Sequence, residues 1–279
     1  MQRSPRSSPR LAGLLICLLA LLFVRPAQAF DQQHTAWDGL LAKHVRLISA
    51  GDASRVDYRG MLADRAILMD YLAGLSAVKP AEFAGFTQPQ KLAFLINAYN
   101  AFTVELILSR YPNFTSIKDL GSLFTSPWKV KFFVLLGQKH ALDDIERDMI
   151  RAPGAFDDPR IHFALNCASI GCPMLRNEAY VGDRLDAQLD NAAGRFLGDR
   201  ERNRYDPQTG TLEVSKIFDW YGGDFERGYR GITSVRSFLA AHAALLTGDS
   251  AARRRIEAQE VPIRYLDYDW RLNDAAAGR

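Results

Sequence analysis

The first third of the chain shows three helix-like stretches of apolar positions. In the first two, these positions recur at intervals of three and four residues, as one buried helix face requires. They are Trp37, Leu40, Leu41, His44 and Val45, and, after a break at 51–58, Met61, Leu62, Ile67, Leu68, Tyr71 and Leu72. The third stretch, 91–111, is the longest and leaves few polar positions before Pro112 closes it. We predict that it forms the central buried helix.

Short strands and helices are expected in the rest of the chain. The predicted strands are 129–136 and 140–142, joined by a turn, then 160–166, 211–214 and the extended segment 261–270. The predicted helices are 144–151, one opened by Asp183, 216–221 and 234–246. Helices outnumber strands and do not alternate regularly with them. The sequence therefore predicts a helix-rich α+β fold, a single domain with a small, mostly antiparallel sheet.

The N-terminal segment has the pattern of a secretory signal peptide. Three arginines precede an apolar run at 11–24, and Ala27-Gln28-Ala29 supplies the small residues that a signal peptidase needs. Fourteen helical residues would span about 21 Å, short of the bilayer core of roughly 30 Å. We therefore predict a signal peptide at 1–29, a periplasmic or secreted domain at 30–279, and no stable membrane anchor after cleavage.

Composition and charge agree with an ordinary globular protein. The chain has 279 residues, of which 48% are hydrophobic and 24% charged, enough apolar surface for a sizeable core. The formal net charge is +3, but the first 29 residues carry four arginines and no acid. The remaining 31 basic and 32 acidic residues give −1, so no nucleic-acid partner is expected.

Cys167 and Cys172 stand in a C-x4-C spacing that allows three interpretations. Export to an oxidising compartment favours a small disulfide between them. Alternatively, Cys167 follows a predicted strand, where a rigid base can present a nucleophilic thiol to solvent. Metal ligation together with His162 is the third interpretation, although the second ligand pair of a closed zinc site is missing. The sequence alone leaves these alternatives open.

A nucleophilic Cys167 requires a base, and His162 is the nearest candidate in sequence. If 160–166 is extended, the Cα atoms of His162 and Cys167 lie about 16 Å apart and their side chains point to opposite faces. A direct pair therefore requires that the chain fold back before Cys167. Otherwise a remote histidine must act, and His140 is the next candidate.

Asn97 and Asn100 form a polar pair on the predicted central helix. They stand three residues apart, so both project from one side of an otherwise apolar helix. Burying an amide without partners costs on the order of 1–3 kcal/mol, so each must bind backbone, another polar group or a ligand. Structural hydrogen bonding is one interpretation. The other is that both line a cleft beside Asn166 and Cys167 and orient a substrate carbonyl.

Several segments of the chain resemble one known family. They are 91–103, 158–169, Cys172-Pro173, 215–225 and Tyr268-Asp269-Trp270. Their order and spacing resemble the family called domain of unknown function 547 over nearly the whole chain after the leader. The family name carries no assigned reaction, so the resemblance implies membership and no activity. Patterns for nucleotide, zincin, α/β-hydrolase and calcium sites are absent from the sequence, and no cofactor is expected.

Two functions follow as hypotheses. The first is a cysteine-dependent hydrolase or acyl transferase that acts on an amide or ester. In it Cys167 attacks, His162 or His140 takes the proton, and Asn166 with Asn97 or Asn100 stabilises the oxyanion. The second is a non-catalytic periplasmic binding or envelope-assembly module shaped by a Cys167–Cys172 disulfide. Its partner, or the substrate of the enzyme, would be a small molecule, a peptide or an envelope component.

Overall fold

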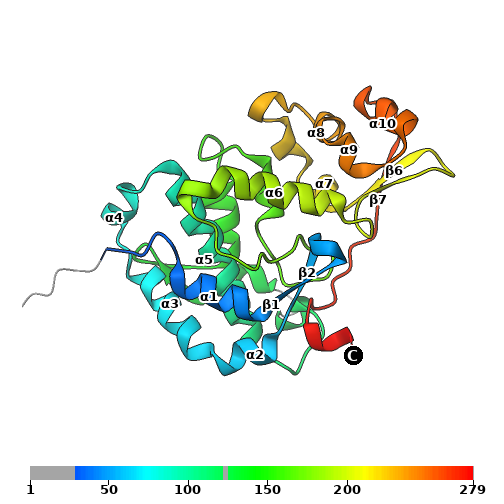
Figure 1. Ribbon diagram of the computed structural model, residues 1–279. Coiled ribbons are helices and arrows are strands. Elements are labelled where there is room, and N and C mark those ends of the chain that lie inside the picture. The colour runs from blue at the N-terminus through cyan, green and yellow to red at the C-terminus, as the bar shows by residue number, and fades with distance from the viewer. Residues whose placement is uncertain (1–28, 122–124, 279) are drawn as a thin grey trace, which may run out of the picture.

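The computed structural model describes residues 29–121 and 125–278 and confirms a helix-rich α+β fold (Figure 1). The predicted signal peptide falls on residues 1–28 and so lies outside the described residues. The α-helices are α1 Thr35–His44, α2 Tyr58–Ala63, α3 Arg65–Ala77, α4 Pro80–Ala84, α5 Gln88–Leu108, α6 Leu185–Gly198, α7 Ile217–Trp220, α8 Val235–Ala241, α9 Ala243–Leu246 and α10 Ser250–Glu257. The strands are β1 Val45–Ile48, β2 Ala53–Val56, β3 Phe133–Leu135, β4 Gln138–His140, β5 Arg204–Asp206, β6 Thr211–Val214 and β7 Ile263–Tyr265. Shorter helical turns include η4 Asp144–Ile150, η5 Pro159–Phe163, η6 Gly182–Arg184 and η7 Gly222–Glu226.

Helix α5 is the central element, as the apolar pattern predicts. Thr87 caps it in a reciprocal pair, because the Gln90 N–H donates to Thr87 Oγ1 and the Thr87 N–H donates to Gln90 Oε1. The helix ends at Leu108, before Pro112. Among the described residues it is the one helix long and apolar enough to cross a membrane, but 83% of its apolar window is buried inside the protein. Its composition is that of a core helix.

Two apolar cores share one helix. The larger core surrounds α5 and includes Trp37 of α1, which stacks on Tyr71 of α3 at a centroid distance of 5.9 Å. The smaller core lies among α6, β6 and the helices that follow, and it is rich in phenylalanine. Helix α6 contributes Leu189 to the first core and Phe196 to the second. It therefore ties the two cores together.

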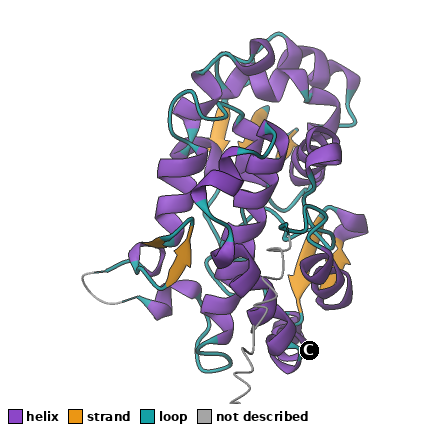
Figure 2. Cartoon of the chain, turned by 90° about the vertical axis from the view of Figure 1, so that its left-hand side faces the viewer, coloured by secondary structure: helices purple, strands orange, loops and turns teal. Residues whose placement is uncertain are grey.

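The strands form three small sheets rather than one (Figure 2). Strands β1 and β2 pair antiparallel, as do β3 and β4, which confirms the predicted hairpin. In the third sheet β5–β6 is antiparallel and β6–β7 is parallel. The expected predominance of antiparallel pairing is thus confirmed. After β7 the chain runs back to the larger core, where Asp274 bridges to Val56, the last residue of β2.

The predicted strand at 160–166 is wrong, and this correction bears directly on the site. Residues Pro159–Phe163 form the 3-10 helix η5. The Asp158 carboxylate accepts the Arg160 N–H at 3.0 Å, and Pro159 occupies the first helical turn, so the local sequence caps a helix. Every residue of η5 is buried. The apolar residues that this burial requires form the run that suggested a strand. The chain is therefore more compact before Cys167 than an extended segment would be.

Other element boundaries differ in smaller ways. The break predicted at 51–58 contains β2, which pairs with β1. The helix predicted at 234–246 is divided at His242 into α8 and α9, and α10 follows unpredicted. The extended segment 261–270 pairs as a strand only in β7. The helix predicted at 216–221 is shorter, α7, and Ser215 Oγ accepts the Ile217 N–H at its start.

Candidate functional site

The loop 167–173 is held against the C-terminal segment by backbone hydrogen bonds. The Ile170 N–H donates to the Arg271 carbonyl and the Gly171 N–H to the Asp269 carbonyl, both at 2.8 Å. The Asn273 N–H donates back to the Ala168 carbonyl at 3.1 Å. A Cβ on Gly171 would lie 2.9 Å from the Asp269 nitrogen, so only glycine allows this close approach. The loop therefore presents its cysteine from a fixed backbone.

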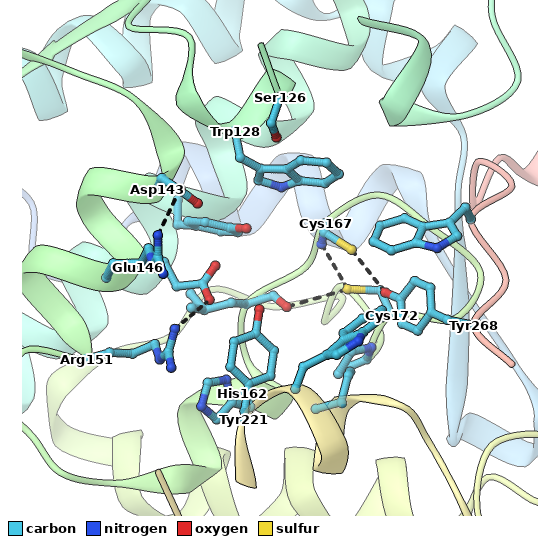
Figure 3. Close-up of a pocket in the computed structure, with 17 residues that line it drawn as sticks. Ser126, Trp128, Asp143, Glu146, Arg151, His162, Cys167, Cys172, Tyr221 and Tyr268 are labelled. Atoms are coloured by element: carbon cyan, nitrogen blue, oxygen red, sulfur yellow. Dashed lines mark hydrogen bonds and ion pairs between the residues drawn. The ribbon is translucent and has the colours of Figure 1, made fainter. Parts of the chain in front are cut away.

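Cys167 is half-buried, and its sulfur is surrounded by neutral hydrogen-bonding groups (Figure 3). Cys167 Sγ lies 3.2 Å from Ser169 Oγ and 3.1 Å from the Tyr268 hydroxyl, which are themselves 2.9 Å apart. Ala168 adopts a left-handed φ of 61°, which curls the loop so that the Ser169 N–H also reaches the sulfur. Successive groups of this kind form a small anion-binding concavity.

Both Cys167 and Cys172 are free thiols in the structure, and their protonation preferences are opposite. Hydrogen bonds from the Cys172 thiol, and then from Ser169 and Tyr268, lower the pKa of Cys167 to about 7 in spite of its burial. Burial raises the pKa of Cys172 well above its ordinary value, and the negative charge on Cys167 adds to that rise. The charged form of the pair therefore places the thiolate on Cys167 and the proton on Cys172.

The three asparagines predicted to orient substrate are all buried and bind backbone groups. Asn97 donates to the Tyr180 carbonyl at 2.7 Å and accepts the Tyr180 N–H at 3.1 Å. Asn100 donates to the Ala164 carbonyl at 2.9 Å and accepts the Asn166 N–H at 2.8 Å.

Asn166 continues this chain of amides into the cysteine loop. Its Nδ2 donates to the Pro173 carbonyl at 2.7 Å, and its Oδ1 accepts the Ala168 N–H at 3.0 Å. Asn100 and Asn166 thus support the backbone of the loop that carries Cys167. The residues that line the neighbouring cavity do not include any of the three, and their contact with substrate stays a prediction.

A cavity of about 420 Å³ opens beside Cys167 and Cys172 (Figure 3). Its aromatic lining consists of Tyr99, Trp128, Trp220, Tyr221, Tyr268 and Trp270. Its charged lining consists of Asp143, Glu146, Arg147 and Arg151. Trp220 is 44% exposed and stacks on Trp270 at a centroid distance of 5.6 Å. The cavity is therefore an aromatic-walled cleft that has a thiol on one side and charged groups on the other.

His162 belongs to the charged side of this cavity. Its Nε2 lies 2.7 Å from Asp224 Oδ2, and its ring stacks on Tyr221 at a centroid distance of 4.0 Å. Burial lowers the pKa of His162, so the neutral ring donates its Nε2–H to the carboxylate. Figure 3 draws Tyr221 between His162 and Cys167. The predicted role of His162 as the base stays a prediction, and the contacts that it makes are structural.

Asp224 and Glu146 extend the charged side. Asp224 binds Arg151 at 2.6 Å and Arg227 at 2.7 Å. In spite of partial burial, the hydrogen bonds from His162 and Arg151 hold the pKa of its carboxyl far below the ordinary value. Glu146 lies 3.7 Å from Arg151 and accepts a hydrogen bond from the Tyr221 hydroxyl. Burial raises the pKa values of Tyr99 and Tyr221, so both phenols keep their protons at neutral pH.

The remaining candidates lie away from the thiol. His140 Nδ1 is 3.4 Å from Asp144 Oδ2, and His140 does not line the cavity. Over residues 29–121 and 125–278, no group of three or more histidine, cysteine, aspartate or glutamate side chains is arranged to hold a metal ion.

The cavity residues that no site prediction named include three tyrosines, Glu146 and Arg151. Tyr99, Tyr221 and Tyr268 come from three distant segments, and only the fold shows that they share one cavity. The signal that could have found them is their presence in the segments that carry the family resemblance. Glu146 and Arg151 lie outside those segments and had no such signal.

Comparison with known proteins gives a family and no activity. No curated protein and no solved structure matches the chain. Residues 83–197 match the family described as "Protein of unknown function, DUF547". The matched segment contains Asn97, Asn100, Asn166 and both cavity cysteines, whereas the aromatic residues after β6 lie beyond it. The resemblance expected from the sequence is thereby confirmed over residues 83–197, and this chain carries a DUF547 region that runs from α4 to α6.

Proposed function

We propose that this protein is a thiol-dependent hydrolase or acyl transferase that uses Cys167 as its nucleophile on an amide or ester. One observation carries the proposal: Cys167 lines a cavity while the Ser169 and Tyr268 hydroxyls stand within 3.2 Å of its Sγ, where they can donate to a thiolate. The thiolate is the nucleophilic form of cysteine, and donors that favour it make the sulfur reactive.

The surroundings of the sulfur reduce the need for a general base. A pKa of about 7 leaves a substantial fraction of Cys167 as thiolate near neutral pH. Proton removal by His162 is then not required before attack. In this proposal His162 positions Tyr221 by stacking and holds Asp224, which in turn holds Arg151.

The cavity also supplies donors for the developing oxyanion. Attack of the Cys167 thiolate on a carbonyl carbon places negative charge on the carbonyl oxygen. The Tyr99 phenol lines the same cavity and remains protonated, so it can donate to that oxygen. The Tyr221 phenol is also protonated and can donate to it when its hydroxyl turns away from Glu146. Collapse of the adduct expels an amine or alcohol, protonated by water in the open cavity. The thioester then passes its acyl group to water or to a second nucleophile.

The proposed location and substrate follow from the leader and the cleft. The arginine-led apolar segment at 1–29 supports export to the periplasm or beyond, without a stable anchor after cleavage. The cavity volume of about 420 Å³ suits part of a small molecule, a peptide or an envelope component. Its aromatic walls favour flat or ring-bearing groups over highly charged ones.

An activated ester tests the proposal directly. The reduced protein, incubated with p-nitrophenyl acetate, should release a burst of one equivalent of p-nitrophenol and carry one acetyl group on Cys167 by peptide mass spectrometry. Cys167→Ser should lose the burst. Ser126→Ala, at an exposed position of the cavity lining, is the matched control and should retain it. Absence of a burst from the fully reduced, folded wild type would contradict the proposal and favour a non-catalytic binding or envelope-assembly module.

A further inference from the structure

Cys167 and Cys172 lie in direct contact but have different access to the cavity. The Cys167 N–H donates to Cys172 Sγ at 2.9 Å, and the Cys172 thiol donates to the Leu165 carbonyl at 3.7 Å. Both cysteines line the cavity, but Cys167 is half-buried whereas Cys172 is only 4% exposed. A molecule in the cavity therefore meets Cys167 more readily than Cys172.

The loop between the two cysteines is already turned back on itself. Ala168 has a left-handed φ of 61°, and the Cys172 N–H donates to the Ser169 carbonyl at 3.2 Å, which closes a tight turn. The C-terminal segment clamps the turn at Ile170 and Gly171. The backbone thus places Cys172 Sγ 2.9 Å from the Cys167 nitrogen while both thiols stay free.

We propose that Cys167 and Cys172 form a redox-active dithiol that reduces a disulfide presented in the aromatic cavity, with Cys167 as the attacking and Cys172 as the resolving cysteine. This activity goes beyond acyl transfer, because its substrate is a disulfide and it requires both sulfurs. It shares with the proposed function only the reactivity of Cys167.

The reaction balances in two exchange steps. The Cys167 thiolate attacks one sulfur of R–S–S–R, forms a Cys167–S–S–R bond and releases RS⁻, which takes a proton from water. Cys172 then loses its proton and attacks Cys167 Sγ, which forms the Cys167–Cys172 disulfide and releases the second RS⁻. The substrate disulfide is reduced to two thiols, and the two cysteines supply both electrons.

The electrostatics of the pair favour this order of events. The Cys167 thiolate and its hydrogen bond are among the causes that raise the pKa of Cys172. Once Cys167 is in a mixed disulfide its negative charge is gone, so that contribution to the pKa of Cys172 disappears. Capture of a substrate thus makes the resolving thiol easier to ionise, whereas an empty cavity keeps it protonated.

The cavity could take its disulfide from a small molecule or from a protein, and the test distinguishes these two sources. The walls accept a compact disulfide or an exposed protein disulfide whose flanking residues meet Trp128, Trp220 and Trp270. Oxidised glutathione represents the first source, and a cyclic peptide closed by one cystine represents the second. Faster reaction with the peptide would assign a protein substrate, and faster reaction with glutathione a small one.

Mass spectrometry of three forms of the full protein tests the proposal. The reduced wild type with oxidised glutathione should form the Cys167–Cys172 disulfide and release two equivalents of glutathione. Cys172→Ala should instead accumulate a mixed disulfide on Cys167, and Cys167→Ala should form neither product. A wild type that keeps glutathione on Cys167, or that reacts with neither disulfide, would overturn the assignment.

A second measurement avoids dependence on the folding of the variants. The wild-type protein, equilibrated in glutathione buffers of increasing oxidation, should interconvert reversibly between a form in which Cys167 and Cys172 are both alkylated and a form in which neither is. A bond that never forms, or that strong reductant cannot reopen, would contradict a redox-active pair. The acyl burst is read separately on the reduced wild type, so either activity can fail while the other stands.

Discussion

The two sides of the cavity differ in the groups that stabilise a negative charge. On the charged side, Asp224 is matched by Arg151, Arg227 and His162, all within 2.7 Å. On the sulfur side, the charge on Cys167 meets only neutral donors, among them Ser169 and Tyr268. A charge that is matched by ion pairs is held in place, whereas one held by neutral donors at an open cavity remains available to a ligand. We infer that the charged side is scaffold and that chemistry belongs to the sulfur side.

The largest expected effect is on the charged side. Asp224→Ala removes a buried carboxylate from two guanidinium groups and from His162, and we expect a loss of about 3–5 kcal/mol in the free energy of unfolding. Urea denaturation measures this loss. Asp219→Ala removes an exposed partner of Lys216, at 3.0 Å, and as the matched control should cost about 0–1 kcal/mol. Equal losses in the two variants would show that the charged side is no scaffold.

A buried histidine away from the cavity, His34, should make the protein less stable in acid. Burial lowers the pKa of His34 to about 4, and its Nδ1 lies 2.7 Å from the Tyr71 hydroxyl. The unfolded chain binds this proton below about pH 6.5, so stability is retained above that pH and lost between it and pH 4. The shift corresponds to about 3 kcal/mol. His162 acts in the same direction because its pKa is also lowered.

Urea denaturation over this pH range checks the assignment to His34. His34→Gln cannot take up the proton, so its unfolding free energy should fall less steeply with acid than that of the wild type. The remaining slope should include the contribution of His162. If both proteins lose stability in parallel, His34 is not a source of the acid sensitivity.

The sequence predicted the long-range framework better than the site. The apolar pattern at 91–111 located α5, because a helix buried on nearly all sides leaves an uninterrupted signal. The same apolar character gave a wrong prediction of a strand at 160–166. There Asp158 and Pro159 start a short 3-10 helix, and the burial comes from tertiary packing. Cys167 and its neighbour Asn166 could be singled out from local sequence. Tyr268 could not be placed at the sulfur, because 101 residues separate it from Cys167 and only the return of the C-terminal segment joins them.

The next prediction concerns the support beneath the sulfur side. Asn166→Ala removes an amide that joins the Pro173 carbonyl to the Ala168 N–H, both inside the cysteine loop. Leaving these buried groups without partners should cost about 2–3 kcal/mol of unfolding free energy. The loop should also open more often, so that Cys172 reacts faster with iodoacetamide. Asn113→Ala, at an exposed loop position, is the control and should change neither quantity.

The smallest expected effect sharpens the comparison most, because it changes one oxygen atom on the sulfur side. Tyr268→Phe removes the hydroxyl that lies 3.1 Å from Cys167 Sγ and keeps the ring against Trp220 and Trp270. A hydrogen bond to a charged group contributes about 1.5–3 kcal/mol, and part of it is replaced by Ser169 and water. We therefore expect the pKa of Cys167 to rise by about one unit. The pH dependence of iodoacetamide alkylation measures this change.

Tyr265→Phe is the matched control, since Tyr265 is 36% exposed on β7 and does not line the cavity. Its alkylation profile should coincide with that of the wild type. A midpoint that stays in place in Tyr268→Phe would mean that Ser169 and Cys172 alone stabilise the thiolate. A lower midpoint in the alkylation profile of Tyr268→Phe would mean that the hydroxyl accepts a hydrogen bond from the Cys167 thiol. The wild-type surroundings would then favour the protonated thiol over the thiolate. Because the ring remains in both variants, the position of the midpoint reports the hydroxyl and not the packing of the aromatic wall.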